Sequence, residues 1–270
     1  MEIKENEIYC VDSYKAIKDI PDKSIDCIYT DIPYLYNQGG SGNSELCERT
    51  AKKKLELMGA LQSFVDTDMT YGEMLKKAKE QRNNNEFVSI EDGINYDILN
   101  EFVRVMKKIN IFIWCSKLQL LEIMKFFIEK HNCYFEIIVW CKTNPTPSTN
   151  NSWLPDLEYC LYFREKGVPL NDGYEFKSKW YDSPINKRDK DKFNHPTIKP
   201  VELVKKHLLH TTQPSDVVLD CFMGSGTTCV ACKDINRKYI GFEIDQKWFK
   251  VAQDRLNNID ATGQFSMFTF

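Results

Sequence analysis

Short apolar runs alternate with amphipathic stretches along most of the chain. Apolar runs that end in polar or turn residues predict buried strands over 8–11, 25–30, 109–114, 135–140, 157–163, 217–219 and 239–244. Apolar positions at helical spacing predict helices over 13–20, 98–108, 117–130 and 201–211, with another running from 227 towards 236. This alternation indicates an α/β domain whose mixed, mostly parallel sheet carries helices on both faces.

Two stretches interrupt this alternation. Residues 37–95 begin rich in Gly, Ser and Asn and continue charged and helix-prone, so we expect an insertion over the functional site. Residues 165–194 are polar and basic without periodicity and form a second insertion. The remainder reads as one domain in two halves, 1–36 with 96–164 and 195–258, followed by a tail over 259–270.

The chain is organised around VVLDCFMGSGTT, residues 217–228. A buried strand places Asp220 at its carboxyl end, and Gly224 and Gly226 permit close approach of a ligand. We expect Thr227 and Thr228 to cap the helix that follows. Ligands of open α/β sheets bind outside such strand ends, so this turn is a candidate small-molecule site. The alternative is an ordinary βαβ turn without a ligand.

The spacing of the glycines restricts the ligand. The turn lacks the third glycine of the dinucleotide fingerprint, and no Lys-Ser or Lys-Thr pair follows to hold a triphosphate, which argues against NAD and ATP. The next predicted strand ends at Glu243, where a carboxylate can accept both hydrogen bonds of a ribose diol. An adenosine without a pyrophosphate fits this pair of features better than a dinucleotide.

A second polar turn follows the predicted strand over 25–30. It reads Asp31-Ile32-Pro33-Tyr34 and combines a hydrogen-bond acceptor with a stiffened turn and an aromatic ring. The alternative is a capped turn with a packed tyrosine. Asp12 likewise follows the first predicted strand.

Composition places the chain among globular proteins. It has 270 residues, of which 42% are hydrophobic and 13% aromatic, enough for one large domain. No apolar run approaches the roughly 20 residues of a membrane helix, and no signal peptide is recognisable, so we expect a cytoplasmic protein without membrane contact. Ten scattered cysteines agree with a reducing compartment. We interpret the Cys229–Cys232 pair as core residues and expect no metal site.

The net charge of −3 does not by itself indicate a nucleic-acid partner. Basic residues nevertheless gather over 49–54, 76–82 and 177–192, the last with Trp180 and Tyr181 among them. Basic stretches with interleaved aromatics are typical of nucleic-acid contacts, although a solvated protein face has the same composition.

Four motifs together resemble the β-type amino-group DNA methyltransferases. They are DIPY at 31–34, HPTIKP at 195–200, FMGSGTT at 222–228 and YIGFEID at 239–245, in the family's order and each on the expected element. The resemblance covers most of 8–34 and 96–257 and leaves both insertions outside it. It implies a Rossmann-like methyltransferase fold, S-adenosylmethionine as cofactor, DNA as partner, and the bacterial, phage or plasmid setting of restriction–modification.

The resemblance also assigns residues. The catalytic turn is Asp31, Ile32, Pro33 and Tyr34, with isoleucine where the family has proline. The cofactor residues are Asp12, Asp31, Thr197, Lys199, Asp220, Phe222, Met223, Gly224, Ser225, Gly226, Thr227, Thr228 and Glu243. The substrate residues are Tyr34, Asn144, Pro145, Lys187, Arg188 and Lys190, the last three in the segment where the family usually carries target recognition.

The implied reaction is methylation of the N6 amine of a flipped-out adenine by direct in-line displacement. Asp31 and the Ile32 carbonyl would accept the two N–H bonds of the amine, and Tyr34 would stack on the base. The alternatives are methylation of cytosine N4, for which the family usually has serine in place of Asp31, and a DNA-binding relative without activity. Methylation at cytosine C5 needs a Pro-Cys turn, which the chain lacks.

The chain ends in GQFSMFTF. Gln264, Phe265, Met267 and Phe268 resemble the short peptide by which bacterial replication proteins hold the sliding clamp. Docking of these residues on the protein's own surface is the favoured alternative, and a homodimer is a further possibility.

Overall fold

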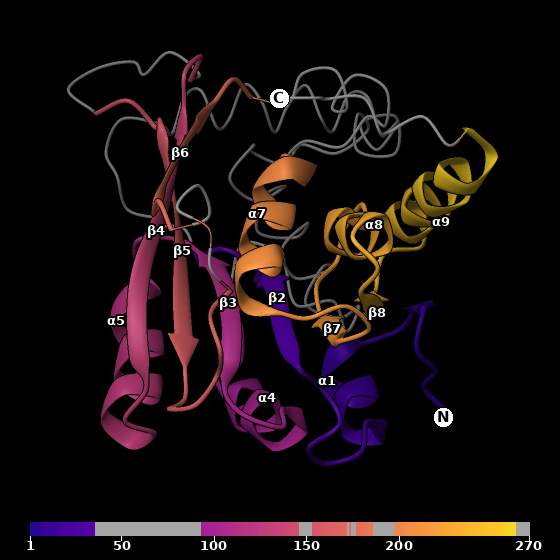
Figure 1. Ribbon diagram of the computed structural model, residues 1–270, viewed down its shortest axis with the longest axis horizontal. Helices are drawn as coiled ribbons and strands as arrows, with labels where there is room; N and C mark the ends of the chain where they lie inside the picture. Colours follow the sequence, from indigo (N-terminus) through magenta and orange to yellow (C-terminus); the bar gives the residue numbers. More distant parts are fainter. Residues whose placement is uncertain (36–92, 146–152, 172, 174–176, 186–197, 263–270) are drawn as a thin grey trace, which may run out of the picture.

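The computed structural model describes residues 1–35, 93–145, 153–171, 173, 177–185 and 198–262, and of 258–262 only the backbone. Within these residues eight strands form one sheet, in the order β1-β8-β7-β2-β3-β5-β4-β6 (Figure 1). The strands are β1 (Glu7–Cys10), β2 (Cys27–Asp31), β3 (Asn110–Cys115), β4 (Tyr134–Lys142), β5 (Leu157–Arg164), β6 (Trp180–Ser183), β7 (Val217–Asp220) and β8 (Lys238–Glu243). Only β5 runs antiparallel to its neighbours, which confirms the expected mostly parallel sheet.

Helices cover both faces of the sheet. The helical elements are α1 (Ser13–Ala16) with the 3-10 turn η1 (Ile17–Asp19), α4 (Ile98–Val105), α5 (Leu120–Met124) with the π-helical turn η2 (Lys125–Lys130), α7 (Val201–Thr211), α8 (Thr227–Asp234) and α9 (Gln246–Thr262). The elements α1, α4 and α5 pack on one face, and α7, α8 and α9 pack together on the other (Figure 1).

Alternation along the strands divides the core into two clusters. In β3, Ile111 and Ile113 belong to the cluster under α1, α4 and α5, whereas Phe112 and Trp114 belong to the cluster under α7, α8 and α9. Because both faces are covered, all six residues of β3 are buried, as expected for a central strand.

The direction of the connections changes between β7 and β2. From β7 the chain passes through α8 to β8 on one side, and from β2 it continues to α4 and β3 on the other. Such a switch point leaves a crevice at the carboxyl ends of the two strands, which is where ligands of open α/β sheets bind. The two turns singled out in the sequence follow these two strands.

Most predicted elements are present with shifted ends. The helix predicted over 98–108 ends at Val105, because Met106 is extended and bridges to Ile25. The second half of the helix predicted over 117–130 is the π-helical turn. The short edge strand β6 was not predicted; it pairs with β4 only, and its Trp180 is 52% exposed, so it carries no buried apolar pattern.

Two expectations from the composition can be compared with the fold. Cys229 and Cys232 are fully buried in the core, as predicted, and no cluster of metal-ligating side chains occurs among the described residues. In the same part of the chain, no helix has the length and apolar character needed to cross a membrane.

Candidate active site

The two polar turns lie at the same edge of the sheet. β2 and β7 are parallel neighbours, with Cys27 paired to Val218 and Ile28 to Leu219. A hydrogen bond joins their ends, since the Thr30 hydroxyl donates to Asp220 Oδ1 at 3.0 Å. The ends of β2 and β7, from which the Asp31 turn and the glycine turn start, are therefore adjacent.

Asp31 belongs to a compact ionic cluster. Lys199 Nζ lies 2.6 Å from Asp31 Oδ2 and 3.0 Å from Glu158 Oε2, and only 8% of the Lys199 side chain is exposed. Lys142 Nζ lies 2.6 Å from Glu158 Oε1 on the far side of that carboxylate. Two lysines and two carboxylates thus compensate one another, as burial of charge requires. Asp31 Oδ1 is buried and has no hydrogen-bond partner in the described part of the chain.

The cluster determines the protonation of its members. Burial alone would lower the pKa of Lys199, but Asp31 and Glu158 outweigh it and raise that pKa well above its ordinary value. Burial alone would raise the pKa of Glu158, but Lys199 and Lys142 lower it to about 2. Neither group can exchange a proton near neutral pH. Loss of solvation raises the pKa of Asp31, with Lys199 opposing it, so Asp31 is the carboxylate of this cluster suited to accept one.

Neighbouring elements hold the turn after Asp31 in place. The Ile32 N–H donates to the Trp114 carbonyl oxygen at 3.1 Å, and the Ile32 side chain is 1% exposed within the core. Gln119, at the start of α5, donates from Nε2 to the Pro33 carbonyl at 2.9 Å. The Tyr34 hydroxyl lies 3.3 Å from Lys199 Nζ. Isoleucine at 32 is therefore a core residue, and the cross-links from β3 and α5 stiffen the turn where the family has a second proline.

Asp220 is the last residue of β7 and is buried. Its Oδ1 accepts hydrogen bonds from the Thr30 hydroxyl and, at 3.1 Å, from the Phe222 N–H. Burial raises the pKa of the Asp220 carboxyl to about 7, although the hydroxyl of Thr228, the Phe222 N–H and Thr30 all donate to it. Asp220 therefore organises the start of the glycine turn from beneath.

The carboxylate of Glu243 reaches the glycine turn from β8. Oε2 accepts the Gly224 N–H at 2.8 Å, and Oε1 accepts the Asp245 N–H at 2.8 Å. Each carboxylate oxygen can accept a second hydrogen bond, so a ribose diol remains compatible with this position. A carboxylate beside a glycine turn at a switch point, with no triphosphate-binding lysine, fits S-adenosylmethionine, the cofactor that the sequence resemblance implies.

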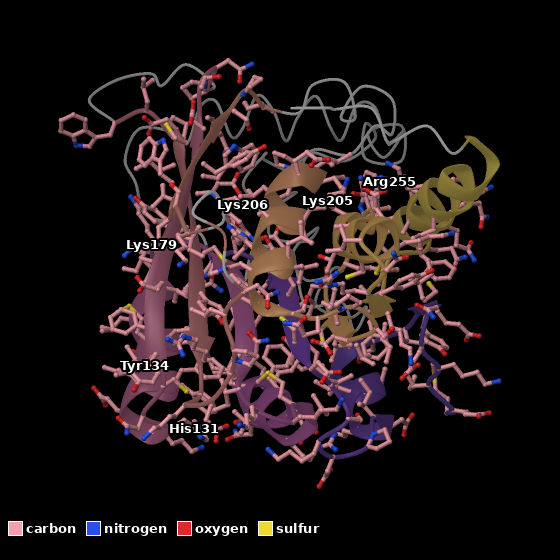
Figure 2. All side chains as sticks on the ribbon, viewed as in Figure 1. His131, Tyr134, Lys179, Lys205, Lys206 and Arg255 are labelled. Carbon is pink, nitrogen blue, oxygen red and sulfur yellow. The ribbon has the colours of Figure 1, made fainter. Side chains whose placement is uncertain are left out.

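The hydroxyls of the glycine turn point inward. The N-cap of α8 is Gly226 at φ +75°, without a side-chain cap, so the expectation that Thr227 and Thr228 cap the helix was wrong. Both threonines lie inside the first turn instead. Arg255 on α9 donates from Nη1 to Ser225 O at 2.7 Å, to Ser225 Oγ at 2.9 Å and to Thr227 Oγ1 at 3.0 Å (Figure 2).

Other residues assigned to the cofactor or the substrate have local contacts. Asp12 caps α1 through the Tyr14 N–H at 2.9 Å. The Phe222 ring packs edge-on against Tyr14, and Met223 is buried. Asn144 Oδ1 accepts the Ile185 N–H at 2.6 Å, and Pro145 follows it in the same loop. The assigned residues outside the described part of the chain are Thr197, Lys187, Arg188, Lys190, Gln264, Phe265, Met267 and Phe268.

Four residues of the site lay outside the sequence interpretation: Lys142, Glu158, Gln119 and Arg255. Charged residues at the ends of otherwise apolar strands are the only signal in the sequence for Lys142 and Glu158. Their meeting depends on β5 lying between β3 and β4, which short-range patterns do not encode.

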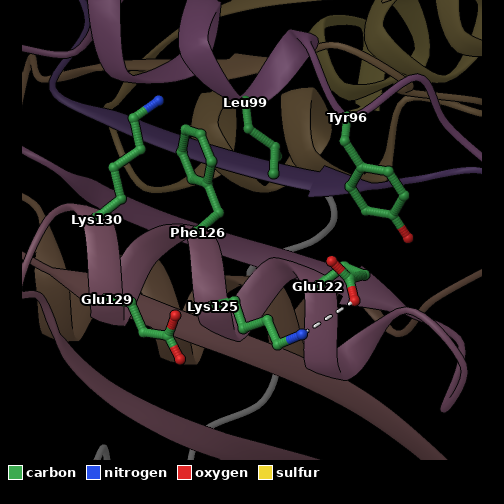
Figure 3. Close-up of a pocket in the computed structure, with 7 residues that line it drawn as sticks. All are labelled: Tyr96, Leu99, Glu122, Lys125, Phe126, Glu129 and Lys130. Atoms are coloured by element: carbon green, nitrogen blue, oxygen red, sulfur yellow. Dashed lines mark ion pairs between the residues drawn. The ribbon is translucent and has the colours of Figure 1, made fainter.

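Two surface cavities lie away from this edge. One, of about 490 Å³, separates Tyr96 and Leu99 from Phe126 and its neighbours on α5 and η2 (Figure 3). The other, of about 400 Å³, lies between the β4–β5 hairpin and α7. The described lining residues of both include none from the four motifs.

Two curated relatives match the chain over most of its length. It is 29% identical to the type II methyltransferase M2.LlaDCHI of Lactococcus lactis subsp. cremoris, covering 94% of this chain and 90% of that protein. It is 26% identical to the type II methyltransferase M2.DpnII of Streptococcus pneumoniae, covering 91% and 87%.

Solved structures share its fold. The M1.HpyAVI–SAM complex superposes with a TM-score of 0.60 at 24% identity, covering 92% of this chain and 98% of that one. The cytosine-N4-specific PvuII DNA methyltransferase superposes with a TM-score of 0.60 at 16% identity, covering 94% and 86%.

The family model described as DNA methylase, N6_N4_Mtase, matches residues 25–254, which include both polar turns and the Asp31–Lys199–Glu158 cluster. With the fold, the switch-point crevice and these relatives, the chain belongs to the N6/N4 family of S-adenosylmethionine-dependent DNA methyltransferases.

Proposed function

We propose that this methyltransferase acts on the N6 amine of adenine in DNA. The observation that carries the proposal is Asp31 itself, an ionisable carboxylate with one oxygen paired to Lys199 and the other buried without a partner in the described residues. A buried acceptor without a donor is costly, so the site is prepared for a donor that arrives with the substrate. Cytosine-N4 enzymes of the family usually have serine here.

The residues of the turn have distinct roles in this proposal. Asp31 Oδ1 and the Ile32 carbonyl accept the two N–H bonds of the amine and turn its lone pair towards the methyl group. When bound, S-adenosylmethionine supplies that methyl group on a positively charged sulfur. Asp31 then accepts the proton that the methylated amine releases, while Tyr34 stacks on the base. Positioning and electrostatics account for most of the acceleration.

The cofactor assignment follows the same edge of the sheet. Glu243 would accept the ribose hydroxyls, and the backbone of Gly224 would lie against the cofactor. Ser225, Thr227 and Met223 are buried, so their part is to shape the turn from within. Lys199 pairs with the Asp31 carboxylate. We therefore assign it to the catalytic cluster as well as to the cofactor pocket.

Incubation of the protein with S-adenosylmethionine and unmethylated plasmid DNA, followed by digestion to nucleosides and mass spectrometry, tests the base. We expect N6-methyl-2′-deoxyadenosine. A digest that contains N4-methyl-2′-deoxycytidine as its only methylated nucleoside would refute the adenine assignment and retain the family. The absence of any methylated nucleoside would favour the non-catalytic relative.

Three assignments about partners remain predictions from the sequence: the residues that contact DNA, a sliding clamp and a homodimer. Lys187, Arg188 and Lys190 would contact DNA phosphates, with Asn144 and Pro145 near the target base. The tail residues 264–268 would bind a sliding clamp, which a pull-down lost on M267A with F268A would support. Analytical ultracentrifugation would test the homodimer.

A further inference from the structure

Glu158 occupies the centre of the ionic cluster although it belongs to none of the four motifs. It lies on β5, opposite Trp140 of β4, and its side chain is 14% exposed. One carboxylate oxygen faces Lys199 at 3.0 Å and the other faces Lys142 at 2.6 Å. A carboxylate that bridges two lysines fixes both of their positions.

The hydrogen bonds of Lys199 are fully used by this arrangement. An ammonium group has three N–H donors. Those of Lys199 have partners in Asp31 Oδ2 at 2.6 Å, Glu158 Oε2 at 3.0 Å and the Tyr34 hydroxyl at 3.3 Å. The ring of Trp114 lies beneath the same ammonium, 4.8 Å away. Lys199 therefore has one direction in which to approach Asp31, and it approaches Oδ2.

We propose that Glu158 is a positioning residue for methyl transfer, which holds Lys199 on Oδ2 of Asp31 so that the buried Oδ1 keeps no partner and can accept a hydrogen bond from the exocyclic amine. Lys142 in turn holds Glu158. This inference rests on the proposed function and deepens it: Glu158 does not touch the reacting atoms but decides which oxygen of Asp31 is available and how basic it is.

The charges around Asp31 determine the sign of each substitution. The titratable groups that interact electrostatically with it are Lys199, Glu158, Tyr29, Tyr34, Asp220, Cys115 and Cys160. Burial raises the pKa of both tyrosines and of both thiols, so these remain neutral near pH 7. Lys199 lowers the pKa of Asp31 and Glu158 raises it. Lys142 acts through Glu158, whose charge it compensates.

The two outer members of the cluster therefore have opposite effects. Glu158→Gln removes a negative charge near Asp31, which lowers the pKa of Asp31 and moves the acid limb of the rate profile to lower pH. Lys142→Gln removes the compensation of Glu158, which raises the pKa of Asp31 and moves the limb to higher pH. A residue with a purely structural role would not produce opposite shifts.

The test is the single-turnover rate of labelled methyl transfer into unmethylated plasmid DNA between pH 5 and pH 9, for the full-length wild type, E158Q and K142Q. We expect E158Q to be slower by about 10- to 100-fold, because misplacement of about 1 Å has this effect on rate. The control is Glu136→Gln, which removes a Glu–Lys pair of 2.8 Å from the exposed part of β4 and should leave rate and profile unchanged.

An inactive wild type would reject the proposed function itself. If the wild type is active, two results would overturn the role of Glu158 and leave the proposed function standing. One is that E158Q and K142Q both transfer at the wild-type rate. The other is that the acid limbs of the two variants shift in the same direction. If E158Q does not fold, the acid limb of K142Q decides, and an unshifted limb overturns the proposal. S-adenosylmethionine affinity, measured by calorimetry, should change less than the transfer rate in both variants, since Glu158 and Lys142 act on the cofactor pocket only through Lys199.

Discussion

The carboxyl groups of Glu158, Asp31 and Asp220 differ in their protonation because their neighbours differ. Glu158 lies between two ammonium groups and is a fixed negative charge, with a pKa of about 2. Asp31 shares the ammonium group of Lys199 with Glu158, and burial keeps the pKa of Asp31 above its ordinary value. Asp220 has only neutral donors around it, and burial raises its pKa to about 7. Environment thus separates a fixed charge, a proton acceptor and a structural acceptor.

The raised pKa of Asp220 has a consequence for stability. Its unfolded pKa is about 3.9. Between about pH 4 and pH 7 the folded state retains a proton that the unfolded state has lost, so this group's contribution falls with rising pH by up to about 1.4 kcal/mol per unit. Asp220→Asn keeps the acceptor for Thr30 and Phe222 without the charge.

We expect the melting temperature of D220N, relative to wild type, to rise as the pH increases from 4 to 7 and to level off above. Calorimetric scans of both proteins at pH 4.5, 6 and 7.5 measure this difference. A constant difference across these three values would mean that Asp220 is not protonated in the folded protein near pH 6.

At the scale of elements, the glycine turn is held from β8 by Glu243 and from α9 by Arg255. The packing of α9 also limits the size of the residue at position 226 in the turn. A Cβ added at Gly226 would lie 2.8 Å from Ala252 Cβ, and the residue has φ +75°. The cofactor turn therefore depends on a helix that follows it in the sequence.

Substitution of Arg255 tests this dependence. Arg255→Met leaves the buried oxygens of Ser225 and Thr227 without their donor, so we expect a loss of about 2 kcal/mol or more in the free energy of unfolding. S-adenosylmethionine affinity, measured by calorimetry, should fall at least about tenfold, equivalent to about 1.4 kcal/mol. Lys250→Met on an exposed position of the same helix is the matched control. Equal affinities for R255M and K250M would show that α9 does not position the turn.

Gly226 and Ala252 form a pair suited to a double-mutant cycle. Gly226→Ala should destabilise the fold by about 2–4 kcal/mol, because the new methyl group meets Ala252 and the left-handed backbone disfavours a side chain. Ala252→Gly removes the methyl group that lies 2.8 Å from the added Cβ, but it leaves Ala252 Cα at 3.3 Å and the backbone strain. The double variant should therefore lose less stability than the sum of the losses of the two single variants. Urea unfolding of the wild type, the two single variants and the double variant measures these free energies. Purely additive losses would show that residues 226 and 252 do not interact.

The sequence predicted those elements whose signals are local. The strands β2 and β7, both polar turns and α7 follow from apolar runs and turn residues. The π-helical turn and the early end of α4 could not be predicted, because tertiary contacts of Met106 and Phe127 override helical spacing there. The residue type of Thr227 predicted a helix cap, whereas its hydroxyl oxygen accepts a hydrogen bond from Arg255.

At the scale of the whole molecule, the site depends on strand order. β2 ends at Asp31 and β7 begins at Val217, 186 residues later in the sequence. Glu158 comes from β5, which lies antiparallel between β3 and β4. Residue patterns located the Asp31 turn and the glycine turn, but the Lys142–Glu158–Lys199 cluster exists only in the assembled sheet. The sequence therefore predicts the two turns but not the contacts that Lys142 and Glu158 make with Lys199.

DNA binding is the property of the whole molecule that the net charge of −3 does not reveal. If Lys187, Arg188 and Lys190 contact phosphates, replacing all three by Gln should reduce the slope of log affinity against log salt by about 2 to 3. Fluorescence anisotropy from 50 to 200 mM salt measures the slope. The control replaces Lys18 and Lys23 by Gln, which are exposed near the amino end of β2 at the opposite edge. An unchanged slope in the triple variant would remove this segment from the interface.

We expect methyl transfer to take place at the carboxyl ends of β2 and β7 and to depend on Asp31. The most direct measurement is the single-turnover transfer of a labelled methyl group to DNA by wild type and Asp31→Asn, with S-adenosylmethionine affinity measured in parallel. We predict transfer reduced by about 100-fold or more in D31N with cofactor binding retained. Transfer by D31N at the wild-type rate would contradict the account.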